Sequence, residues 1–391
     1  MWQPSGLANY MTWWQKLRQN SLARIGAIIL LTFYAIVFAA EFMAPYDPYF
    51  SAPSASLLPP TEVYWRHQAT GEFIGPHVYP TTQGPVSIET GEREVFVDFE
   101  QPSPIRLLVR GDEYRWFRLK LPLPTQFSWS NPAFEEVVIF PGIAGDRHLF
   151  GTVGPGRWYL LGTDAHARAQ LSRLIYGGRI SLSIGLIGIA LSFPLGMLVG
   201  GVAGYFGGWI DAVLMRLVEV IMTIPAIYLL VALAAVLPAT LSSTQRFLLI
   251  ILITSFVRWT GLARVVRGQV LSLKSQTFVT ASKAMGGQPL YIVVRHVLPQ
   301  TATYVIISAT LAIPGFIVAE AVLSLIGLGI QQPDPSWGNM LSLASNASIL
   351  VLHPWLIWPP AFLIVLTVLS FNLLGDGLRD ALDPRSLQSH D

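Results

Sequence analysis

Long apolar runs alternate with shorter polar segments along most of the chain. A bilayer core of about 30 Å needs roughly 20 apolar residues in helical conformation, and six of the runs are long enough. The pattern therefore predicts an all-α polytopic membrane protein with six transmembrane helices. The predicted spans are residues 23–43, 180–206, 213–238, 246–264, 302–328 and 355–375.

The first run, residues 23–43, has two interpretations. Lys16, Arg18 and Arg24 precede or open it, and a basic start before an apolar stretch is also typical of a secretory signal peptide. The run is long, however, and it closes on VFAAEF without a clean A-x-A cleavage site. We therefore favour an uncleaved membrane helix at 23–43, preceded by a cytoplasmic segment at 1–22.

The composition agrees with a membrane protein. Hydrophobic residues make up 52% of the chain and charged residues only 12%, against about 25% charged in soluble domains. The chain contains no cysteine, which excludes disulfides, thiolate chemistry and cysteine-ligated metals. Its seven histidines show neither H-x-x-x-H nor H-E-x-x-H spacing. We therefore expect no catalytic residue, no metal site and no nucleic-acid partner.

The distribution of basic residues predicts the orientation in the membrane, because cytoplasmic loops carry an excess of Lys and Arg. The N-terminal segment is basic and free of acids. The segment after the fourth span is also basic and free of acids, with Arg264, Arg267 and Lys274 at its start. Both are predicted to be cytoplasmic, and six spans that start inside place the second segment inside too. The tail, residues 376–391, is then cytoplasmic as well.

Residues 44–165 differ from the rest of the chain because they are rich in Pro, Tyr, Trp and Phe. The run REVFVDF alternates apolar and polar residues, and IRLLVRGDEYRWFRLKL predicts two strands joined by a turn at Gly111-Asp112. We expect a β-rich domain on the outer face. It either shields and rigidifies the membrane domain or contacts a substrate-delivery protein. We favour the first role, because the segment holds no site-like cluster.

A short helix is predicted between the fourth and fifth spans, in the sequence TASKAMGGQPLYIVVRHVLP at residues 280–299. Ser275 is expected to cap its N-terminus, Gly286 to end it in the left-handed conformation, and Pro289 to prevent its continuation. About ten helical residues are too few to be stable alone in water. The helix must therefore dock on something.

Two docking partners are open for this helix. Phe278, Ala281 and Met285 form a narrow apolar stripe, and a basic amphipathic helix of this kind can lie along the membrane surface. A protein cleft is the favoured alternative, because small side chains permit close approach and anchor poorly in lipid. The small residues are Thr280, Ala281, Ser282, Ala284 and Gly286.

Several segments of the chain resemble one family of membrane proteins. FVTASKAMGGQPLYIVVRHVLP is similar to the cytoplasmic EAA loop of ABC importer permeases, E-A-A-x-x-x-G followed by I-x-L-P. More narrowly, the chain resembles the second permease subunit of dipeptide, oligopeptide and nickel importers over residues 13–50 and 160–386. The other matching segments are WWQKLRQNSLARIGAIILL with APYDP, LGTDAHARAQLSRLIYGGRISLSIGL, GYFGGWIDAVLMRLVEVIMTIPAIYL, EAVLSLIGLGIQQPDPSWGNML and NLLGDGLRDALDPR.

The resemblance implies a type I ABC importer permease in the bacterial inner membrane. Its transmembrane core is residues 166–375, and the loop at 265–300 is implied to couple to an ATPase. The residues implied to make that contact are Phe278, Thr280, Ala281, Ser282, Lys283, Ala284, Met285, Gly286 and Gly287.

The partners implied by the resemblance are a second permease in a heterodimer, two cytoplasmic ATPases, an extracytoplasmic substrate-binding protein and the lipid bilayer. The chain has no G-x-x-x-x-G-K-[ST] loop to cradle phosphates. We therefore expect no cofactor on this chain, and ATP with Mg²⁺ in the partner subunits. The protein is expected to be a transport subunit and not an enzyme.

The chain departs from the family pattern at three places. Thr280 replaces the leading Glu of the loop, so the salt bridge of that Glu is lost, and Ser282 replaces the second Ala. Ala167-Arg168-Ala169 stands where Gly-Arg-Asp is usual before the second span, so an acid is missing. The long segment between the first two spans has no counterpart in the family.

Charges inside the spans are functional candidates by default. Arg216 and Glu219 lie three residues apart on one predicted helix and can pair, either structurally at the inner face or for function. Glu320 lies beyond a Pro314-Gly315 break. It either bonds backbone freed by that break or lines a transport path. Arg258 is a further intramembrane charge without an assigned role.

Two other classes of function compete with the importer. A stand-alone secondary transporter is disfavoured because the sequence shows no clear repeat of three spans. A membrane-anchored receptor or scaffold would place the function in the outer β-rich domain. Within the importer hypothesis, peptides are the leading substrate, followed by nickel chelates and then by sugar oligomers.

Overall fold

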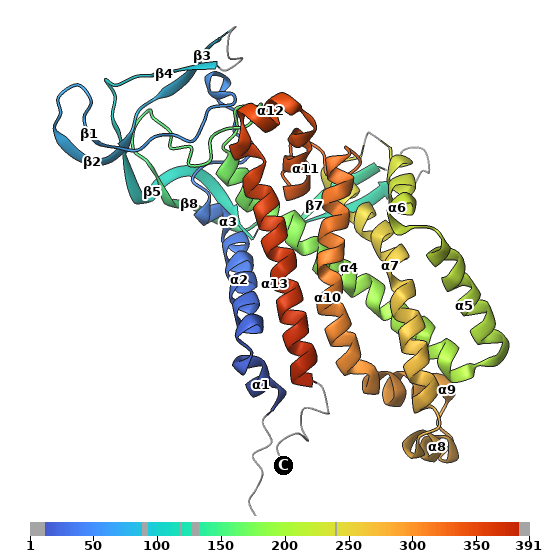
Figure 1. The fold of residues 1–391 in the computed structure, drawn as a ribbon. Helices are drawn as coiled ribbons and strands as arrows, with labels where there is room; N and C mark the ends of the chain where they lie inside the picture. The colour runs from blue at the N-terminus through green and yellow to red at the C-terminus, as the bar shows by residue number, and fades with distance from the viewer. Residues whose placement is uncertain (1–11, 88–92, 118, 127–132, 239–240, 383–391) are drawn as a thin grey trace, which may run out of the picture.

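The long apolar runs form helices, and these helices build most of the molecule (Figure 1). The computed structural model describes residues 12–87, 93–117, 119–126, 133–238 and 241–382. Within them, five helices are long and apolar enough to cross a membrane, or up to six if one bent pair is counted as a span. The five are Ser21–Phe38 (α2), Gln170–Phe206 (α4), Ser243–Leu273 (α7), Pro289–Leu325 and Pro354–Leu382.

The last two of these spans contain several shorter elements. Pro289–Leu325 joins α9 (Pro289–Ile292), a π-helical turn η2 (Val293–Val297), η3 (Leu298–Thr301) and α10 (Ala302–Leu325). Pro354–Leu382 joins η5 (Pro354–Leu356) and α13 (Trp358–Leu382). The remaining helical elements are α1 (Trp13–Gln19), α3 (Ala40–Met43), η1 (Pro53–Ala55), α5 (Gly208–Thr223), α6 (Ala226–Ala235), α8 (Thr277–Ala284), α11 (Trp337–Leu341), η4 (Ser342–Ser345) and α12 (Ala347–Leu352).

The predicted span at 213–238 is not one continuous helix, because α5 and α6 are bent by 81° at a break between them. Ile224 has extended backbone angles, φ −83° and ψ 124°, and precedes Pro225. A proline clashes with a helical conformation of the residue before it and lacks the N–H that would continue the helix. The count of six spans therefore holds only if the bent pair crosses the membrane as one unit.

The longest helices pack through glycine. Gly196, Gly200 and Gly204 recur every fourth residue on α4 and face carbonyl oxygens of α7. A methyl group at Gly200 would lie 2.3 Å from the carbonyl oxygen of Ala263. Because lipid is as apolar as the side chains, membrane helices associate through such close packing of small residues. The α4–α7 contact is therefore possible only because these three residues have no side chain.

A second glycine contact joins α2 to α13. At Gly26, a methyl group would lie 2.6 Å from the carbonyl oxygen of Ser370, and at Gly377 it would lie 2.2 Å from the Cβ of Ala23. Tyr34 of α2 also donates a hydrogen bond to the carbonyl of Leu182 on α4, at 3.2 Å. The predicted first span thus packs along one face against α13 and α4.

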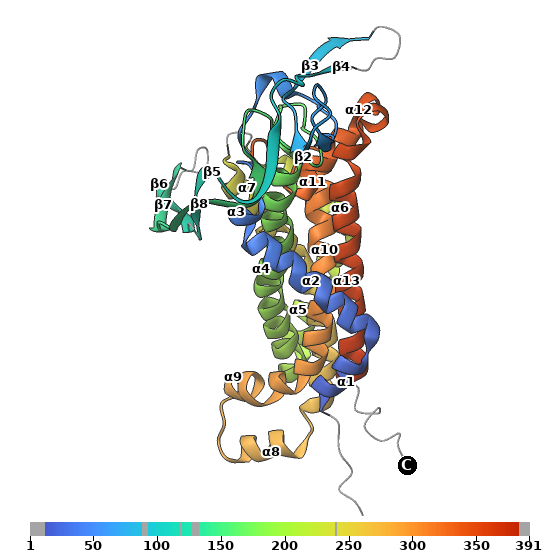
Figure 2. The ribbon, with the colours of Figure 1, turned by 90° about the vertical axis from the view of Figure 1, so that its left-hand side faces the viewer.

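A β-rich region lies at one end of the bundle, opposite α8 (Figures 1 and 2). One antiparallel sheet has the order β1-β2-β5-β8, and β3-β4 and β6-β7 form separate hairpins. The predicted strand at REVFVDF is confirmed as β4. The strands are β1 (Tyr64–Arg66), β2 (Phe73–Val78), β3 (Thr81–Val86), β4 (Arg93–Val97), β5 (Ser103–Trp116), β6 (Leu119–Gln126), β7 (Ala133–Phe140) and β8 (Ile143–Thr152).

The predicted turn at Gly111-Asp112 is wrong, because β5 runs through both residues as one strand. Its pairing with β8 shifts register between Arg110 and Tyr114, so the two residues lie in a bulge. His148 of β8 packs under the bulge, and its Nε2 lies 3.1 Å from the carbonyl oxygen of Asp112. A methyl group at Gly111 would clash with that ring at 2.6 Å.

The predicted terminal segments are described only in part. Of the N-terminal segment at 1–22, residues 1–11 lie outside the described residues. Of the tail at 376–391, residues 383–391 lie outside them, and the part before them continues α13 to Leu382.

Candidate functional site

The elbow helix α8 projects beyond the bundle, joined to it by two turns (Figure 2). Gly286 has φ +82°, which confirms its predicted left-handed conformation. The N-cap is Gln276 and not Ser275 as predicted. Ser275 instead closes the turn after α7, where its hydroxyl donates to the carbonyl of Ser272 at 3.2 Å. Helix α8 therefore begins one residue later than expected.

The two faces of α8 have opposite environments. Val279 and Ser282 are both buried, and Val279 belongs to an apolar cluster that includes Ile292 and Val293. The predicted stripe points away from the chain, with Phe278 exposed by 41% and Met285 by 82%. Ala281 between them is exposed too. The apolar stripe therefore has no partner within the described residues.

The polar residues of the elbow are partly engaged within the chain. Thr280, which replaces the family's Glu, donates its hydroxyl to the carbonyl of Thr277 at 2.9 Å. The ammonium group of Lys283 lies 4.9 Å from the ring centroid of Tyr205, at the end of α4. Ala284 is exposed, whereas Gly287 packs closely on Ser282. Lys283 thus braces the elbow against α4 through a cation–π contact.

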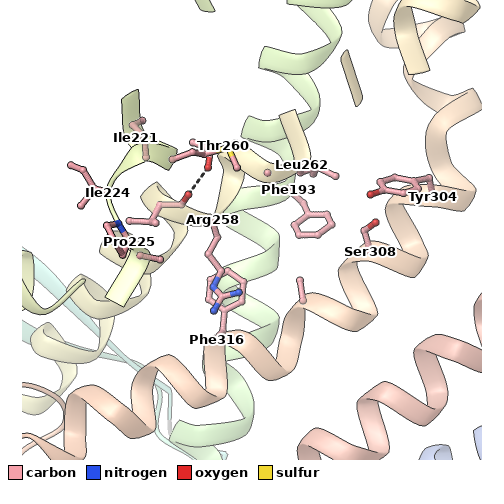
Figure 3. Close-up of a pocket in the computed structure, with 15 residues that line it drawn as sticks. Phe193, Ile221, Ile224, Pro225, Arg258, Thr260, Leu262, Tyr304, Ser308 and Phe316 are labelled. Atoms are coloured by element: carbon pink, nitrogen blue, oxygen red, sulfur yellow. Dashed lines mark hydrogen bonds between the residues drawn. The ribbon is translucent and has the colours of Figure 1, made fainter. Parts of the chain in front are cut away.

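A cavity of about 440 Å³ lies between the α5–α6 break, α7 and α10 (Figure 3). Its walls are mostly apolar, and the break itself contributes Ile224 and Pro225. The hydroxyl groups of Tyr304 and Ser308 line it from α10. Volume and composition match those of small-molecule sites, which are apolar with a few placed polar groups.

Arg258 is the one charged side chain among the described residues that line this cavity. Its guanidinium lies 5.3 Å from the ring centroid of Phe316, and its Nη2 donates to the carbonyl of Gly315 at 2.7 Å. A methyl group at Gly315 would lie 2.3 Å from Nη1, so glycine makes this approach possible. Sequence reasoning named Arg258 but could not pair it with α10.

The predicted pair of Arg216 and Glu219 is present on α5, at 3.4 Å. Their side chains are 80% and 54% exposed, so the pair faces away from the rest of the chain. Sequence reasoning missed a second ionic contact of α5, in which Asp211 accepts from Arg267 of α7 at 2.6 Å. That contact holds the N-terminal turn of α5 against α7.

Glu320 is fully buried and bonds side-chain hydroxyls. The break expected at Pro314-Gly315 is absent, because α10 runs through both residues, so no backbone is freed there for Glu320 to bond. It accepts from Ser324 at 2.7 Å, from Ser336 at 2.8 Å and more weakly from Ser181 at 3.4 Å. It does not line the cavity described above. These bonds connect α10 to α4 and to the N-terminus of α11.

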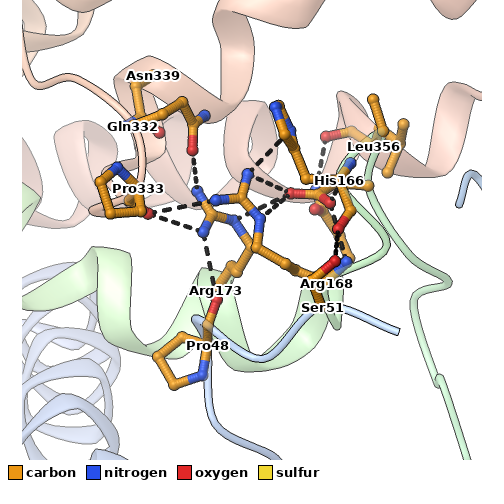
Figure 4. Close-up of polar contacts among 12 residues, drawn as sticks. Pro48, Ser51, His166, Arg168, Arg173, Gln332, Pro333, Asn339 and Leu356 are labelled. Carbon is orange, nitrogen blue, oxygen red and sulfur yellow. Dashed lines mark hydrogen bonds and ion pairs between the residues drawn. The ribbon is translucent and has the colours of Figure 1, made fainter. Parts of the chain in front are cut away.

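A buried ionic cluster lies where the β-rich region meets the bundle (Figure 4). Asp164 pairs with Arg168 at 2.7 Å and with Arg173 at 3.3 Å, and all three side chains are almost wholly buried. Arg173 also donates to the carbonyls of Pro48 and Pro333, at 3.3 and 3.0 Å. The cluster thus connects the start of α4 to the segments at Pro48 and Pro333.

The arrangement of these parts defines a polytopic helical membrane protein, with a cavity among its spans and an exposed elbow at one end. Residues 193–388 match the family described as "Binding-protein-dependent transport system inner membrane component". Residues 11–60 match the N-terminal TM domain of oligopeptide transport permease C. The chain belongs to the family of binding-protein-dependent transport system inner membrane components, which confirms the resemblance stated from the motifs.

Two relatives named as peptide permeases are similar to this chain. The oligopeptide transport system permease protein OppC of Haemophilus influenzae is 41% identical over 228 residues, which are 58% of this chain and 71% of the relative. The dipeptide transport system permease protein DppC of Bacillus subtilis is 41% identical over 231 residues, which are 59% of this chain and 70% of the relative. A chain from the inward-facing MetNI methionine ABC transporter is 20% identical with a TM-score of 0.41, covering 55% of this chain and 97% of its own length.

Proposed function

We propose that this chain is one permease subunit of an ATP-driven importer and forms half of a translocation path for peptides. The permeases OppC and DppC named above support the substrate class, because their names specify oligopeptides and dipeptides. The α8 elbow carries the coupling part of the proposal. An unpartnered apolar stripe on an eight-residue helix needs a protein surface to cover it.

The partner on that stripe is a cytoplasmic ATPase in this proposal. Phe278, Ala281 and Met285 enter a groove of the ATPase, while Val279 and Ser282 hold the helix to this chain. Movement of the groove is passed through α7 and α9 to the spans, as a rigid-body switch. ATP and Mg²⁺ bind to the ATPases and not to this chain.

The same proposal orients the chain in a bacterial inner membrane. The elbow loop at 265–300, the segment at 1–22 and the tail at 376–391 are cytoplasmic, and residues 44–165 lie outside. A second, different permease completes the path, and a binding protein delivers the substrate from outside. The β-rich region rigidifies the outer end of the bundle, which the indole N–H of Trp116 supports by donating to the carbonyl of Phe38 at 3.1 Å.

The test is ATP-dependent peptide uptake by the complex reconstituted in liposomes, with Gly286→Val as the diagnostic variant. Valine in the left-handed region costs about 1–2 kcal/mol and distorts the end of α8. We expect normal assembly in the membrane but loss of uptake and of substrate-stimulated ATP hydrolysis. Lys283→Glu should act more mildly, because an exposed charge contact is worth about 0–1 kcal/mol.

Gly71→Val is the matched control for backbone strain. Gly71 has φ +71° and, like Gly286, has no other atom within 4 Å of the position of a Cβ, but it lies in the outer region. It should leave uptake and hydrolysis intact. If Gly286→Val kept both activities in a complex of normal abundance, the coupling role of α8 would be wrong. Uptake driven by an ion gradient without ATP would point to a secondary transporter instead.

A further inference from the structure

Arg258 raises a question of charge balance inside the membrane. An isolated guanidinium in an apolar environment is costly, and such residues almost always pair or face a functional cavity. Between residues 170 and 325, the acids of the sequence are Asp211, Glu219 and Glu320. Asp211 is bound to Arg267, Glu219 to Arg216, and Glu320 to serine hydroxyls. Among the described residues, Arg258 therefore has no carboxylate partner.

The guanidinium is held in place but keeps most of its hydrogen-bonding capacity. The guanidinium lies over the ring of Phe316, 5.3 Å from its centroid, and the bond to Gly315 uses one of five N–H donors. Arginine binds carboxylates through two parallel N–H bonds, for which a fixed planar fork is suited. The site is thus prepared for a planar anion.

The rest of the cavity suits a short peptide chain beside that anion. The hydroxyls of Tyr304 and Ser308 have no hydrogen-bond partner among the described residues, and both line the cavity on α10 (Figure 3). Apolar residues of the wall, such as Phe193 and Ile221, can contact the side chains of a bound peptide without selecting one type. One cation, two free hydroxyls and apolar walls can hold a terminal carboxylate, peptide groups farther along the substrate and variable side chains.

We propose that Arg258 binds the terminal carboxylate of the peptide during its passage through the membrane. This inference rests on the proposed peptide transport and adds a selectivity inside the path: substrates with a free C-terminal carboxylate are favoured over amidated ones. A carboxylate from the partner permease is the competing occupant, and the experiment separates the two.

The experiment measures uptake of one tripeptide, as the free acid and as the C-terminal amide, by the reconstituted full complex. Saturating binding protein is used, and its own affinity for each peptide is measured separately. The wild type should favour the free acid at the membrane step. Arg258→Gln should lower uptake of the free acid by about tenfold, the loss expected for one charge-assisted contact, and leave the amide unchanged.

Two further variants keep the result interpretable. Arg258→Lys retains the charge without the planar fork, so an intermediate ratio of acid to amide uptake is expected. Arg216→Gln removes an arginine that lies outside the cavity and should leave the ratio unchanged. Equal loss of acid and amide uptake in Arg258→Gln would overturn the proposal and indicate a structural or inter-subunit pair. Absence of any ATP-dependent peptide uptake by the wild type would instead overturn the proposed function itself.

Discussion

The glycine contact between α4 and α7 predicts that replacing glycine by alanine has opposite effects on stability at Gly200 and at Gly268. At Gly200, a methyl group would lie 2.3 Å from the carbonyl oxygen of Ala263. That distance is about 1 Å short of an ordinary contact, and the atom it meets belongs to a backbone that cannot rotate away. At Gly268 of α7, the same methyl group would meet no atom within 4 Å.

The expected change in stability is the sum of two opposing contributions, helix propensity and overpacking. Replacing a helical glycine by alanine stabilises a helix by up to about 1 kcal/mol. Overpacking a close contact costs typically about 1–3 kcal/mol. Gly268→Ala should therefore be neutral or stabilising by up to about 1 kcal/mol, whereas Gly200→Ala should be net destabilising by about 1–2 kcal/mol.

The assay is unfolding of the purified chain in mixed micelles by titration with a denaturing detergent. Tryptophan fluorescence reports the transition, since Trp259 of α7 is buried and packs in a cluster with Val218 and Ala263. The unfolding midpoint of Gly200→Ala should lie below that of the wild type, and the midpoint of Gly268→Ala at or above it. Equal midpoints for the two variants would refute the close-packing explanation.

Two further predictions concern the buried ionic cluster at Asp164 and the orientation in the membrane. Asp164→Asn leaves two buried arginines without a counter-charge, so it should lower the free energy of unfolding by about 3–5 kcal/mol in the same titration. The control is Asp146→Asn, which removes an exposed partner of Arg110 and should lower that free energy by at most about 1 kcal/mol. Cysteines introduced singly at Ser54 and Ser275 of this cysteine-free chain should differ in intact cells. An impermeant thiol reagent should label only the first, and labelling of the second would reverse the proposed orientation.

The apolar runs predict where helices form but not whether a proline breaks them. Pro194 and Pro314 lie inside continuous helices, whereas the chain bends at Pro225. Neighbouring helices can stabilise a helix that has lost a backbone bond to proline. Glycines of α4 pack closely on α7 just after Pro194, but α6 buries only Leu230 and Ala234. Tertiary support of this kind cannot be read from the local sequence.

Local signals in the sequence also predicted the elbow better than the cavity. Gly286 could be assigned because its left-handed conformation depends on the next few residues. The bulge at Gly111 depends on His148, and the environment of Arg258 depends on Phe316 of another helix. Contacts between residues far apart in sequence decide both, so the pattern around each residue could not predict them.

The packing of α2 on α13 has a consequence for the biogenesis of the protein. During synthesis, α2 is the first of the described spans to leave the ribosome, and α13 is the last. The glycine and alanine face of α2, at Ala23 and Gly26, thus stays unpaired until translation of the described chain is nearly finished. The nascent bundle remains open to chaperones, proteases and premature association throughout that time. Packing of α13 against α2 then covers this face.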